Sequence, residues 1–124
     1  MSLQEDRLTA LLEELREFVR ERDWEQFHDT KNLAMCLASE VGELLAEYRW
    51  IANHHADRIS REPERQKRIT AELGDVGIAW LLLCDRLELD PLETIRVKLD
   101  TNRAKYPLEL SRGNADRVKG KERG

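Results

Sequence analysis

The chain has 124 residues, which is enough for one domain, and 37% of them are charged, with a formal net charge of −4. This acidic balance excludes an electrostatic basis for binding duplex DNA, which needs a basic face for its phosphates. The first residues contain no apolar signal-peptide core, and the longest apolar run, 76–84, is too short to span a bilayer. We therefore expect a cytoplasmic protein with neither a membrane nor a nucleic-acid polymer as its partner.

Apolar residues recur at helical spacing along most of the chain, and strand-like alternation is absent from the sequence. The spacing predicts an all-α fold with helices over about residues 5–21, 30–50, 64–87 and 91–104. Asp29 or Thr30 suits the N-cap of the second helix, and Asp90 followed by Pro91 suits the start of the fourth. The polar segment 51–63 is predicted to be a connecting loop. The expected organisation is one domain over residues 1–110 and a flexible polar tail over 111–124.

The centre of the third predicted helix, 76–84, is apolar on all sides. Such a helix must be covered on most sides, and a chain of this size does not supply enough cover. We expect a second copy of the chain to complete it. Cys36 and Cys84 both lie in apolar helical stretches, which predicts two buried free thiols in a reducing compartment; a disulfide between them is the alternative.

Two short acidic motifs lie inside these apolar helices, Glu40-Val-Gly-Glu43 and Glu72-Leu-Gly-Asp75. Acids at this i, i+3 spacing share one face of a helix. If the two apolar faces meet, the four carboxylates meet as well, and they need cations to remain ionised together. A ligand set made only of carboxylate oxygens favours Mg²⁺ or Mn²⁺, and no Cys/His cluster in the sequence favours zinc.

The alternative is that these acids face solvent and pair with Lys or Arg. Gly42 and Gly74 argue against it, because a glycine inside a helix costs about 1 kcal/mol relative to alanine. Close approach of the helices or access for a ligand would explain both glycines. Glu47, one turn beyond Glu43, either joins the acidic face or is solvated.

The segments Ser39-Glu40-Val41-Gly42-Glu43 and Glu72-Leu73-Gly74-Asp75 resemble the motifs of the MazG-like all-α nucleoside triphosphate pyrophosphohydrolases. Three further features are similar to the dCTP pyrophosphatase branch of that family. They are Arg22-Asp23-Trp24-Glu25-Gln26-Phe27-His28, then Asn32 and Trp50, then Lys98-Leu-Asp-Thr-Asn102-Arg103-Ala-Lys105-Tyr106-Pro107. The resemblance covers about residues 5–110. It implies a four-helix MazG-like bundle completed by oligomerisation, as a dimer or a dimer of dimers.

The resemblance also implies Mg²⁺-dependent hydrolysis of the α–β phosphoanhydride bond of a nucleoside triphosphate, dCTP or a modified dCTP, in cleansing of the nucleotide pool. The metal ligands and catalytic residues are then expected to be Glu40, Glu43, Glu72 and Asp75. We prefer Glu43 for orienting or deprotonating the attacking water, although the sequence does not separate ligand from base.

The substrate is expected to need positive partners for its phosphates and aromatic or amide groups for its base. The phosphate candidates are Lys98, Asn102, Arg103, Lys105 and Tyr106, and the base candidates are Trp24, His28, Asn32 and Trp50. Each has an ordinary alternative: a solvated basic face for the cations, packing against the first helix for Tyr106, a core position for either tryptophan, and a hydrogen-bonded structural role for His28.

Two positions depart from the family pattern. Ser39 stands where the broader family has a further glutamate, and Ala79 stands where the dCTP branch often has a tyrosine, so the base preference is open. Two other functions also fit the helical pattern. They are a non-catalytic oligomer that binds nucleotide or metal, and a plain helical assembly module.

Overall fold

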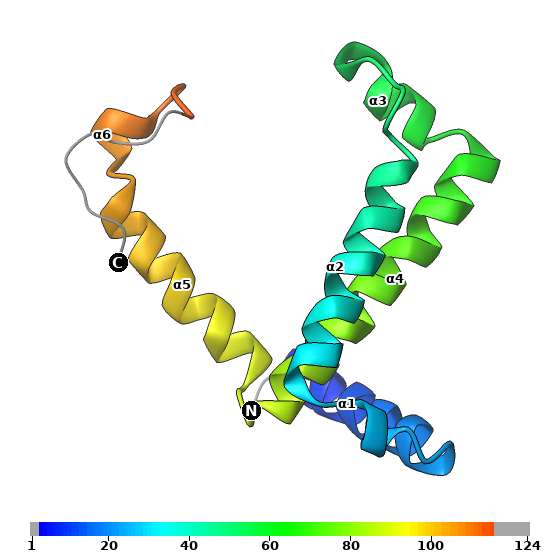
Figure 1. Ribbon diagram of the computed structural model, residues 1–124. Coiled ribbons are helices and arrows are strands. Elements are labelled where there is room, and N and C mark those ends of the chain that lie inside the picture. Colours follow the sequence, from blue (N-terminus) through cyan, green and yellow to red (C-terminus); the bar gives the residue numbers. More distant parts are fainter. Residues whose placement is uncertain (1–2, 116–124) are drawn as a thin grey trace. The chain divides into compact units, whose positions relative to one another are not determined.

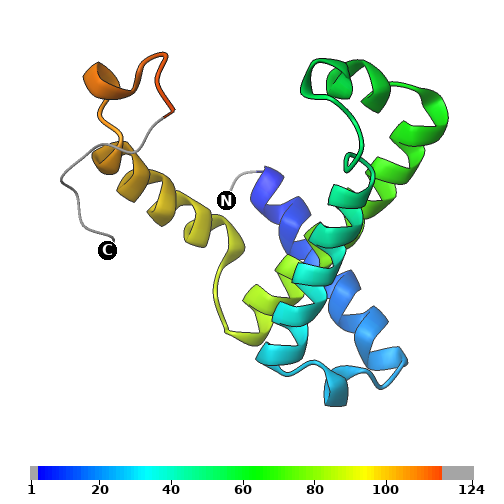
Figure 2. The ribbon, with the colours of Figure 1, turned by 45° about the horizontal axis from the view of Figure 1, so that its top comes forward.

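The computed structural model of the chain describes residues 3–115, and every regular element among them is helical (Figures 1 and 2). In chain order these are α1 (Leu3–Glu21), the 3₁₀ helix η1 (Glu25–Phe27), α2 (Thr30–Ala46), α3 (Asn53–Ser60), α4 (Pro63–Arg86), α5 (Pro91–Lys105) and α6 (Leu108–Ser111). The all-α class and the four long predicted helices, now α1, α2, α4 and α5, are confirmed. None of the helices within residues 3–115 combines the length and the apolarity of a membrane span.

The chain divides into two compact units, Met1–Glu88 and Leu89–Gly124. The first contains α1 to α4, and the second contains α5 and α6. The predicted single domain over residues 1–110 stays a prediction.

The first unit is built on α2 and α4, which run antiparallel and side by side (Figures 1 and 2). Both helices carry an apolar stripe, and burying these stripes against one another is the main favourable term. The buried apolar side chains of this unit are Val19, Leu33, Ile69, Ala79, Leu81 and Cys84. The pair therefore forms a rigid support to which α1 and α3 are attached.

Helix α1 is joined to the end of α4 by an ion pair as well as by apolar contact. Arg16 Nε lies 3.1 Å from each carboxylate oxygen of Asp85, and Arg16 Nη2 lies 2.6 Å from Oδ1. This fork geometry is the strong form of a charge-assisted hydrogen bond. The hydrogen bonds to Asp85 raise the pKa of Arg16 above its usual range.

The helix starts follow the expected capping chemistry. Asp29 is the N-cap of α2, and its Oδ1 accepts the Asn32 backbone N–H at 2.8 Å. In the second unit, Asp90 caps α5 in the same way by accepting the Glu93 N–H at 2.9 Å, with Pro91 at the first helical position. Both caps satisfy backbone donors that a helix leaves without a partner.

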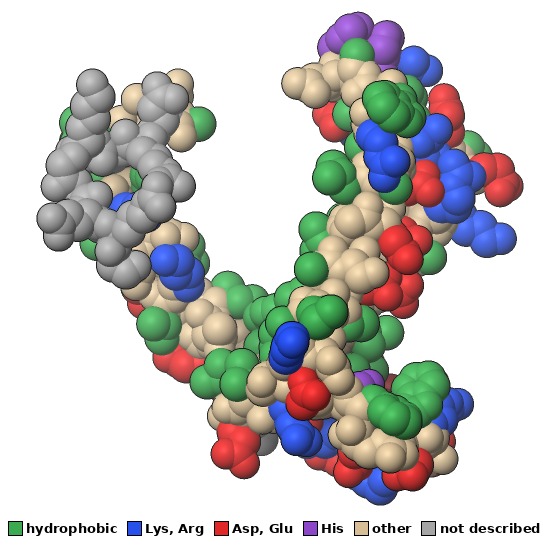
Figure 3. Space-filling view, viewed as in Figure 1, with side chains coloured by type: hydrophobic (Ala, Val, Ile, Leu, Met, Phe, Trp, Pro, Cys, Tyr) green, Lys and Arg blue, Asp and Glu red, His purple; other side chains and the backbone are tan. Residues whose placement is uncertain are grey.

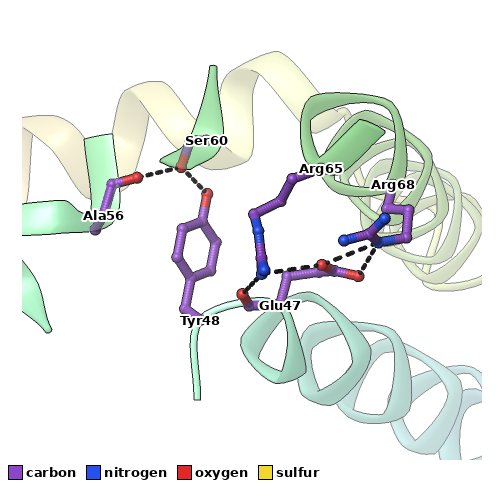
Figure 4. Close-up of polar contacts among 6 residues, drawn as sticks. All are labelled: Glu47, Tyr48, Ala56, Ser60, Arg65 and Arg68. Atoms are coloured by element: carbon purple, nitrogen blue, oxygen red, sulfur yellow. Dashed lines mark hydrogen bonds and ion pairs between the residues drawn. The ribbon is translucent and has the colours of Figure 1, made fainter. Parts of the chain in front are cut away.

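The predicted loop over residues 51–63 is wrong, because α3 occupies Asn53–Ser60. This helix is held by the Tyr48 hydroxyl, which lies 2.8 Å from Ser60 Oγ, while Ser60 Oγ donates to the Ala56 carbonyl at 2.7 Å (Figure 4). With eight residues it is too short and too polar for its periodicity to be read from sequence. The second predicted helix also ends earlier than expected, at Ala46, and continues as a turn to residue 50.

Two further expectations have different outcomes. Cys84 is buried, but Cys36 is exposed, so the prediction of two buried thiols is wrong for Cys36; both thiols are free. The polar tail predicted over 111–124 lies partly in α6, which ends at Ser111, and its residues 116–124 lie outside the described residues.

The cap of α2 supplies a test of the fold. Asp29→Ala removes the acceptor for the Asn32 N–H, so we expect the free energy of unfolding to fall by about 1 kcal/mol. Urea unfolding followed by circular dichroism measures this loss. Asp29→Ser keeps a capping oxygen and is expected to stay close to wild type; equal destabilisation by both substitutions would contradict the capping role.

Candidate functional site

The contact between α2 and α4 brings two rows of side chains, most of them polar, face to face. Helical spacing places the members of each row on one face, and the antiparallel arrangement reverses their order. The row on α2 is Asn32, Cys36, Glu40, Glu43 and Glu47, and the row on α4 is Ala79, Asp75, Glu72, Arg68 and Arg65. The two acidic motifs, which are far apart in the sequence, therefore meet in the middle of the pair.

Three glutamates form a close group there. Carboxylate oxygens of Glu40, Glu43 and Glu72 all lie within 4.8 Å of one another. Oε2 of Glu40 and Oε2 of Glu72 are buried and have no hydrogen-bond partner in the described part of the chain. A buried oxygen without a partner is costly, and a carboxylate beside other carboxylates is more so.

The electrostatics of the group follow from this arrangement. Burial is the first cause that raises the pKa of Glu40, and the neighbouring carboxylates of Glu43 and Asp75 raise it further. Burial likewise comes first in raising the pKa of Glu72, followed by the influence of Glu43, Asp75 and Glu40. The site therefore disfavours its own ionised form unless a cation is present.

Asp75 contributes to this field from the next turn of α4. It lies outside the close group of three glutamates, yet its charge raises the pKa of both Glu40 and Glu72. It also lines, together with Glu40, the cavity described below. Of the four predicted ligands, three are brought together and the fourth borders them.

The donor set fits a hard divalent cation. All the candidate ligand atoms are carboxylate oxygens, and two of them are buried oxygens that lack a partner. A Cβ added at Gly42 or Gly74 would meet no atom within 4 Å. Close helix approach, one of the two expected reasons for these glycines, is therefore wrong for the described residues, and the space beside the acids stays open.

An apolar cavity of about 380 Å³ adjoins the carboxylates in the first unit. Its walls come from α1, η1, α2 and α4. The lining residues that bear on the prediction are Trp24, His28, Asn32, Glu40 and Asp75, and the apolar part includes Leu15, Phe18, Phe27, Ile78, Ala79 and Leu82. Three of the four predicted base residues and two of the four predicted metal ligands thus line one cavity.

The aromatic side of the cavity is ordered by local contacts. Trp24 packs edge-on against Phe18 with ring centroids 5.7 Å apart, and the Trp24 and His28 rings lie 6.5 Å apart. The Asn32 side-chain amide donates to the Phe27 carbonyl at 3.1 Å. This bond orients Asn32 so that its own carbonyl oxygen remains an acceptor.

Trp50 is the base candidate that the first unit does not bring to the cavity. Its side chain is 89% exposed in the turn after α2 and is absent from the cavity lining. In contrast, Phe18 and Cys36 line the cavity although sequence reasoning gave them no role. The sequence contains a pattern that could have identified both residues, because Cys36 precedes Glu40 by one helical turn and Phe18 belongs to the apolar stripe of α1.

Glu47 ends the acidic row but is neutralised. Its carboxylate lies 3.0 Å from Arg68 Nε and 3.6 Å from Arg65 Nη1 (Figure 4). The side chain of Glu47 is only 17% exposed. It is therefore neither a solvated glutamate nor a member of the close carboxylate group.

Comparison with known proteins identifies the family. The chain is 38% identical over 117 residues to dCTP pyrophosphatase 1 of Rattus norvegicus and 36% identical over 108 residues to that of Homo sapiens, with 91% and 84% of this chain covered. These matches span 69% and 64% of the two relatives' own lengths. The chain belongs to the dCTP pyrophosphatase branch of the MazG-like family. No family model matches the sequence.

A solved structure supports the same assignment. A pyrophosphatase from Archaeoglobus fulgidus is 35% identical and superposes with a TM-score of 0.77, covering 82% of this chain and 93% of that one. The predicted resemblance is thereby confirmed, as is the class of enzyme, a nucleoside triphosphate pyrophosphatase of all-α MazG-like fold.

The phosphate candidates of this MazG-like chain lie in its second unit, on α5 and at its end. Lys98 is exposed and Asn102 is half-buried. Arg103 pairs with Asp100 at 3.2 Å, and Lys105 Nζ lies 5.7 Å from the centre of the Tyr106 ring. Their role toward a substrate stays a prediction, as does that of the four acids and the base candidates.

The two departures from the family pattern have different surroundings. Ser39 is exposed on α2. Ala79 is only 2% exposed and forms part of the cavity wall. The missing tyrosine therefore changes the shape of the cavity itself, whereas the missing glutamate leaves the three close glutamates intact.

The raised pKa values of Glu40 and Glu72 determine the sign of a pH effect. The folded state holds these protons more tightly than the unfolded chain, so the free energy of unfolding falls as the pH rises from the ordinary value of 4.5 through the raised values. Glu40→Gln removes one ionising group. We expect a shallower fall in Tm between about pH 5 and pH 8, and a higher Tm at about pH 8, in EDTA.

Thermal melts of the metal-free protein measure this effect. Glu14→Gln changes an exposed glutamate on α1 and is expected to follow wild type. A Glu40→Gln variant whose Tm falls as steeply as that of wild type would show that the carboxylates do not repel one another in the folded state.

Proposed function

We propose that this protein is a Mg²⁺-dependent pyrophosphohydrolase that converts dCTP, or a modified dCTP, to the monophosphate and pyrophosphate, and that it thereby cleanses the cytoplasmic nucleotide pool. One observation carries the proposal. Three glutamates form a close group, two of them, Glu40 and Glu72, with a buried oxygen that has no partner among the described residues, and the group adjoins through Glu40 an apolar cavity lined by Trp24, His28 and Asn32. The named relatives of this chain, the dCTP pyrophosphatases 1, support the same substrate.

The carboxylates would hold the cation. Glu40, Glu43 and Glu72 offer the nearest oxygens, and Asp75 would complete the set from the adjoining turn. When bound, Mg²⁺ or Mn²⁺ would neutralise phosphate charge and make water a better nucleophile at neutral pH. Glu43 is the exposed member of the group, which makes it the best placed to orient a water and take its proton.

The cavity would hold the nucleoside. Its apolar walls exclude water, and the Trp24 ring offers a face or edge on which a base can stack. The free carbonyl oxygen of Asn32 suits a donor, such as the exocyclic amino group of cytosine. This polarity favours cytosine over thymine or uracil.

The second unit and a neighbouring copy of the chain are proposed to complete the site. Lys98, Asn102, Arg103, Lys105 and Tyr106 are proposed to contact the phosphates. A homo-oligomer, a dimer or a dimer of dimers, is proposed because large apolar side chains on α2 and α4 are exposed in one chain, among them Leu45 at 64% and Leu73 at 54%. Trp50 would act on the base from such a neighbouring copy.

Glu43→Gln tests the proposed role of Glu43 as the group that takes a proton from water. Since it removes the proposed proton acceptor, we expect kcat for dCTP to fall by about 10²- to 10⁴-fold. Ion-exchange chromatography of the products is expected to show dCMP and pyrophosphate for wild type, and only with Mg²⁺ or Mn²⁺ present. Glu14→Gln is the matched control and is expected to keep wild-type activity.

Other outcomes separate the alternatives. Orthophosphate with dCDP as the product would contradict the proposed bond. Tight dCTP binding without turnover under any divalent ion would indicate a non-catalytic nucleotide-binding oligomer. A Tm that neither Mg²⁺ nor dCTP changes would indicate a helical assembly module, because a ligand of the folded state must stabilise it.

Trp24 tests the cavity. Loss of one base–aromatic stacking contact costs about 1–3 kcal/mol, so Trp24→Ala is expected to raise KM for dCTP by about 5- to 150-fold. Trp24→Phe keeps a ring and is expected to lie much closer to wild type. Steady-state kinetics across the four common deoxynucleoside triphosphates measure both variants; an unchanged KM in Trp24→Ala would remove the ring from the binding site.

A further inference from the structure

Two arginines continue the α4 row beyond the carboxylates. Arg68 precedes Glu72 by four residues and Arg65 precedes it by seven, so both keep to the face that carries Glu72. One helical turn, about 5.4 Å along the axis, separates Arg68 from the carboxylate group. In the space-filling view, basic side chains gather over the α3 end of the α2–α4 pair, and acidic ones follow toward its middle (Figure 3).

The two guanidinium groups converge on one carboxylate. Arg68 Nε donates to Glu47 Oε1 at 3.0 Å and to Oε2 at 3.3 Å, and Arg65 Nη1 donates to the Glu47 backbone carbonyl at 2.5 Å (Figure 4). Two positive charges against one negative charge leave the cluster with an excess of one positive charge. Glu47 thus holds the arginines in place without cancelling them.

Arg68 retains binding capacity. Its hydrogen bonds to Glu47 run through Nε, and its side chain is 53% exposed. The two terminal amines of its guanidinium have no hydrogen-bond partner among the described residues, and they form part of the planar fork that suits phosphate oxygens. Arg65, with 28% exposure and a bond to the main chain, is the more fixed of the two.

Three kinds of chemistry follow one another along the same helix pair. The apolar cavity lies toward the end of the pair that carries Leu33 and Leu82, the carboxylates lie in the middle, and the arginines lie at the other end. A nucleoside triphosphate has the same order: an aromatic base, the α-phosphate at the bond that is cut, and the highly negative pyrophosphate group. If the base lies in the cavity and the α-phosphate lies at the carboxylates, the pyrophosphate group lies at the arginine end of the row.

We propose that Arg68, supported by Arg65 and oriented by Glu47, binds the pyrophosphate half of the substrate and the pyrophosphate product. The inference rests on the proposed function. In that reaction water adds to the α-phosphorus, the bond from this phosphorus to the α–β bridging oxygen breaks, and pyrophosphate leaves with that oxygen and its electron pair, while the water proton passes to a carboxylate. A guanidinium one turn from the carboxylates stabilises the negative charge that develops on the leaving group.

Product inhibition tests the assignment. Arg68→Gln removes one charge-assisted contact, so we expect the inhibition constant for pyrophosphate to rise by about 10- to 100-fold, while that for dCMP stays unchanged. Arg68→Lys is expected to recover part of the loss. Arg61→Gln, an exposed arginine at the C-cap of α3, is the matched control and is expected to match wild type. An equal rise for both products, or no rise for pyrophosphate, would overturn the proposal.

Glu47→Gln separates binding from a purely structural role. Glutamine keeps a side-chain oxygen that can accept from Arg68 Nε and so preserves the orientation of Arg68, while it removes the negative charge that competes with a phosphate. We therefore expect the inhibition constant for pyrophosphate to stay the same or fall. If the ion pair mattered only for holding α2 to α4, Glu47→Gln and Arg68→Gln would raise that constant alike, and the proposal would be wrong.

Calorimetric titration with pyrophosphate in the presence of Mg²⁺ keeps the inference distinct from the proposed function, since it needs no turnover. Pyrophosphate binding by wild type that is lost in Arg68→Gln supports the assignment even if no triphosphate is hydrolysed. Equal binding by the two proteins, or none by wild type, overturns it even if dCTP hydrolysis is found.

Discussion

The antiparallel contact between α2 and α4 is the constraint on which the rest of this chain depends. It buries apolar stripes, and in doing so it brings carboxylate oxygens of Glu40, Glu43 and Glu72 within 4.8 Å of one another. The same packing that stabilises the pair therefore creates repulsion at its centre. The partnerless oxygens of Glu40 and Glu72 show where this cost is concentrated. Such a local cost, kept within a well-packed helix pair, is of the kind that proteins concentrate at functional centres.

Much of this arrangement could be predicted from the helical periodicity of the sequence. The i, i+3 spacing of Glu40 and Glu43, and of Glu72 and Asp75, places each pair on one helix face. The apolar residues around each pair predict that these two faces meet. The capping residues Asp29 and Asp90 fixed where α2 and α5 begin. The core of the site was predictable because each of these features depends on residues within one or two helical turns.

What was missed depends on contacts between distant segments. Helix α3 is held at Ser60 by the Tyr48 hydroxyl, a partner twelve residues away that the local sequence pattern does not reveal. Glu47 differs from Glu43 only through Arg65 and Arg68, which come from another helix. The exposure of Cys36 has the same origin, because an apolar stretch does not say which of its faces a single chain covers.

The cavity wall formed by α1 shows how a remote polar pair shapes the site. Leu15, Phe18 and Val19 line the cavity from α1, and Arg16 lies among them in the sequence. The bidentate ion pair of Arg16 with Asp85 joins α1 to the turn of α4 that follows Leu82, and Leu82 is itself part of the cavity lining. Because α2 and α4 are fixed by their own packing, the width of the cavity depends on where α1 lies, and this ion pair together with the buried side chain of Val19 holds α1 there. The position of the aromatic wall thus depends on a bidentate ion pair as well as on apolar packing, while the acids opposite are positioned by the apolar packing of α2 on α4.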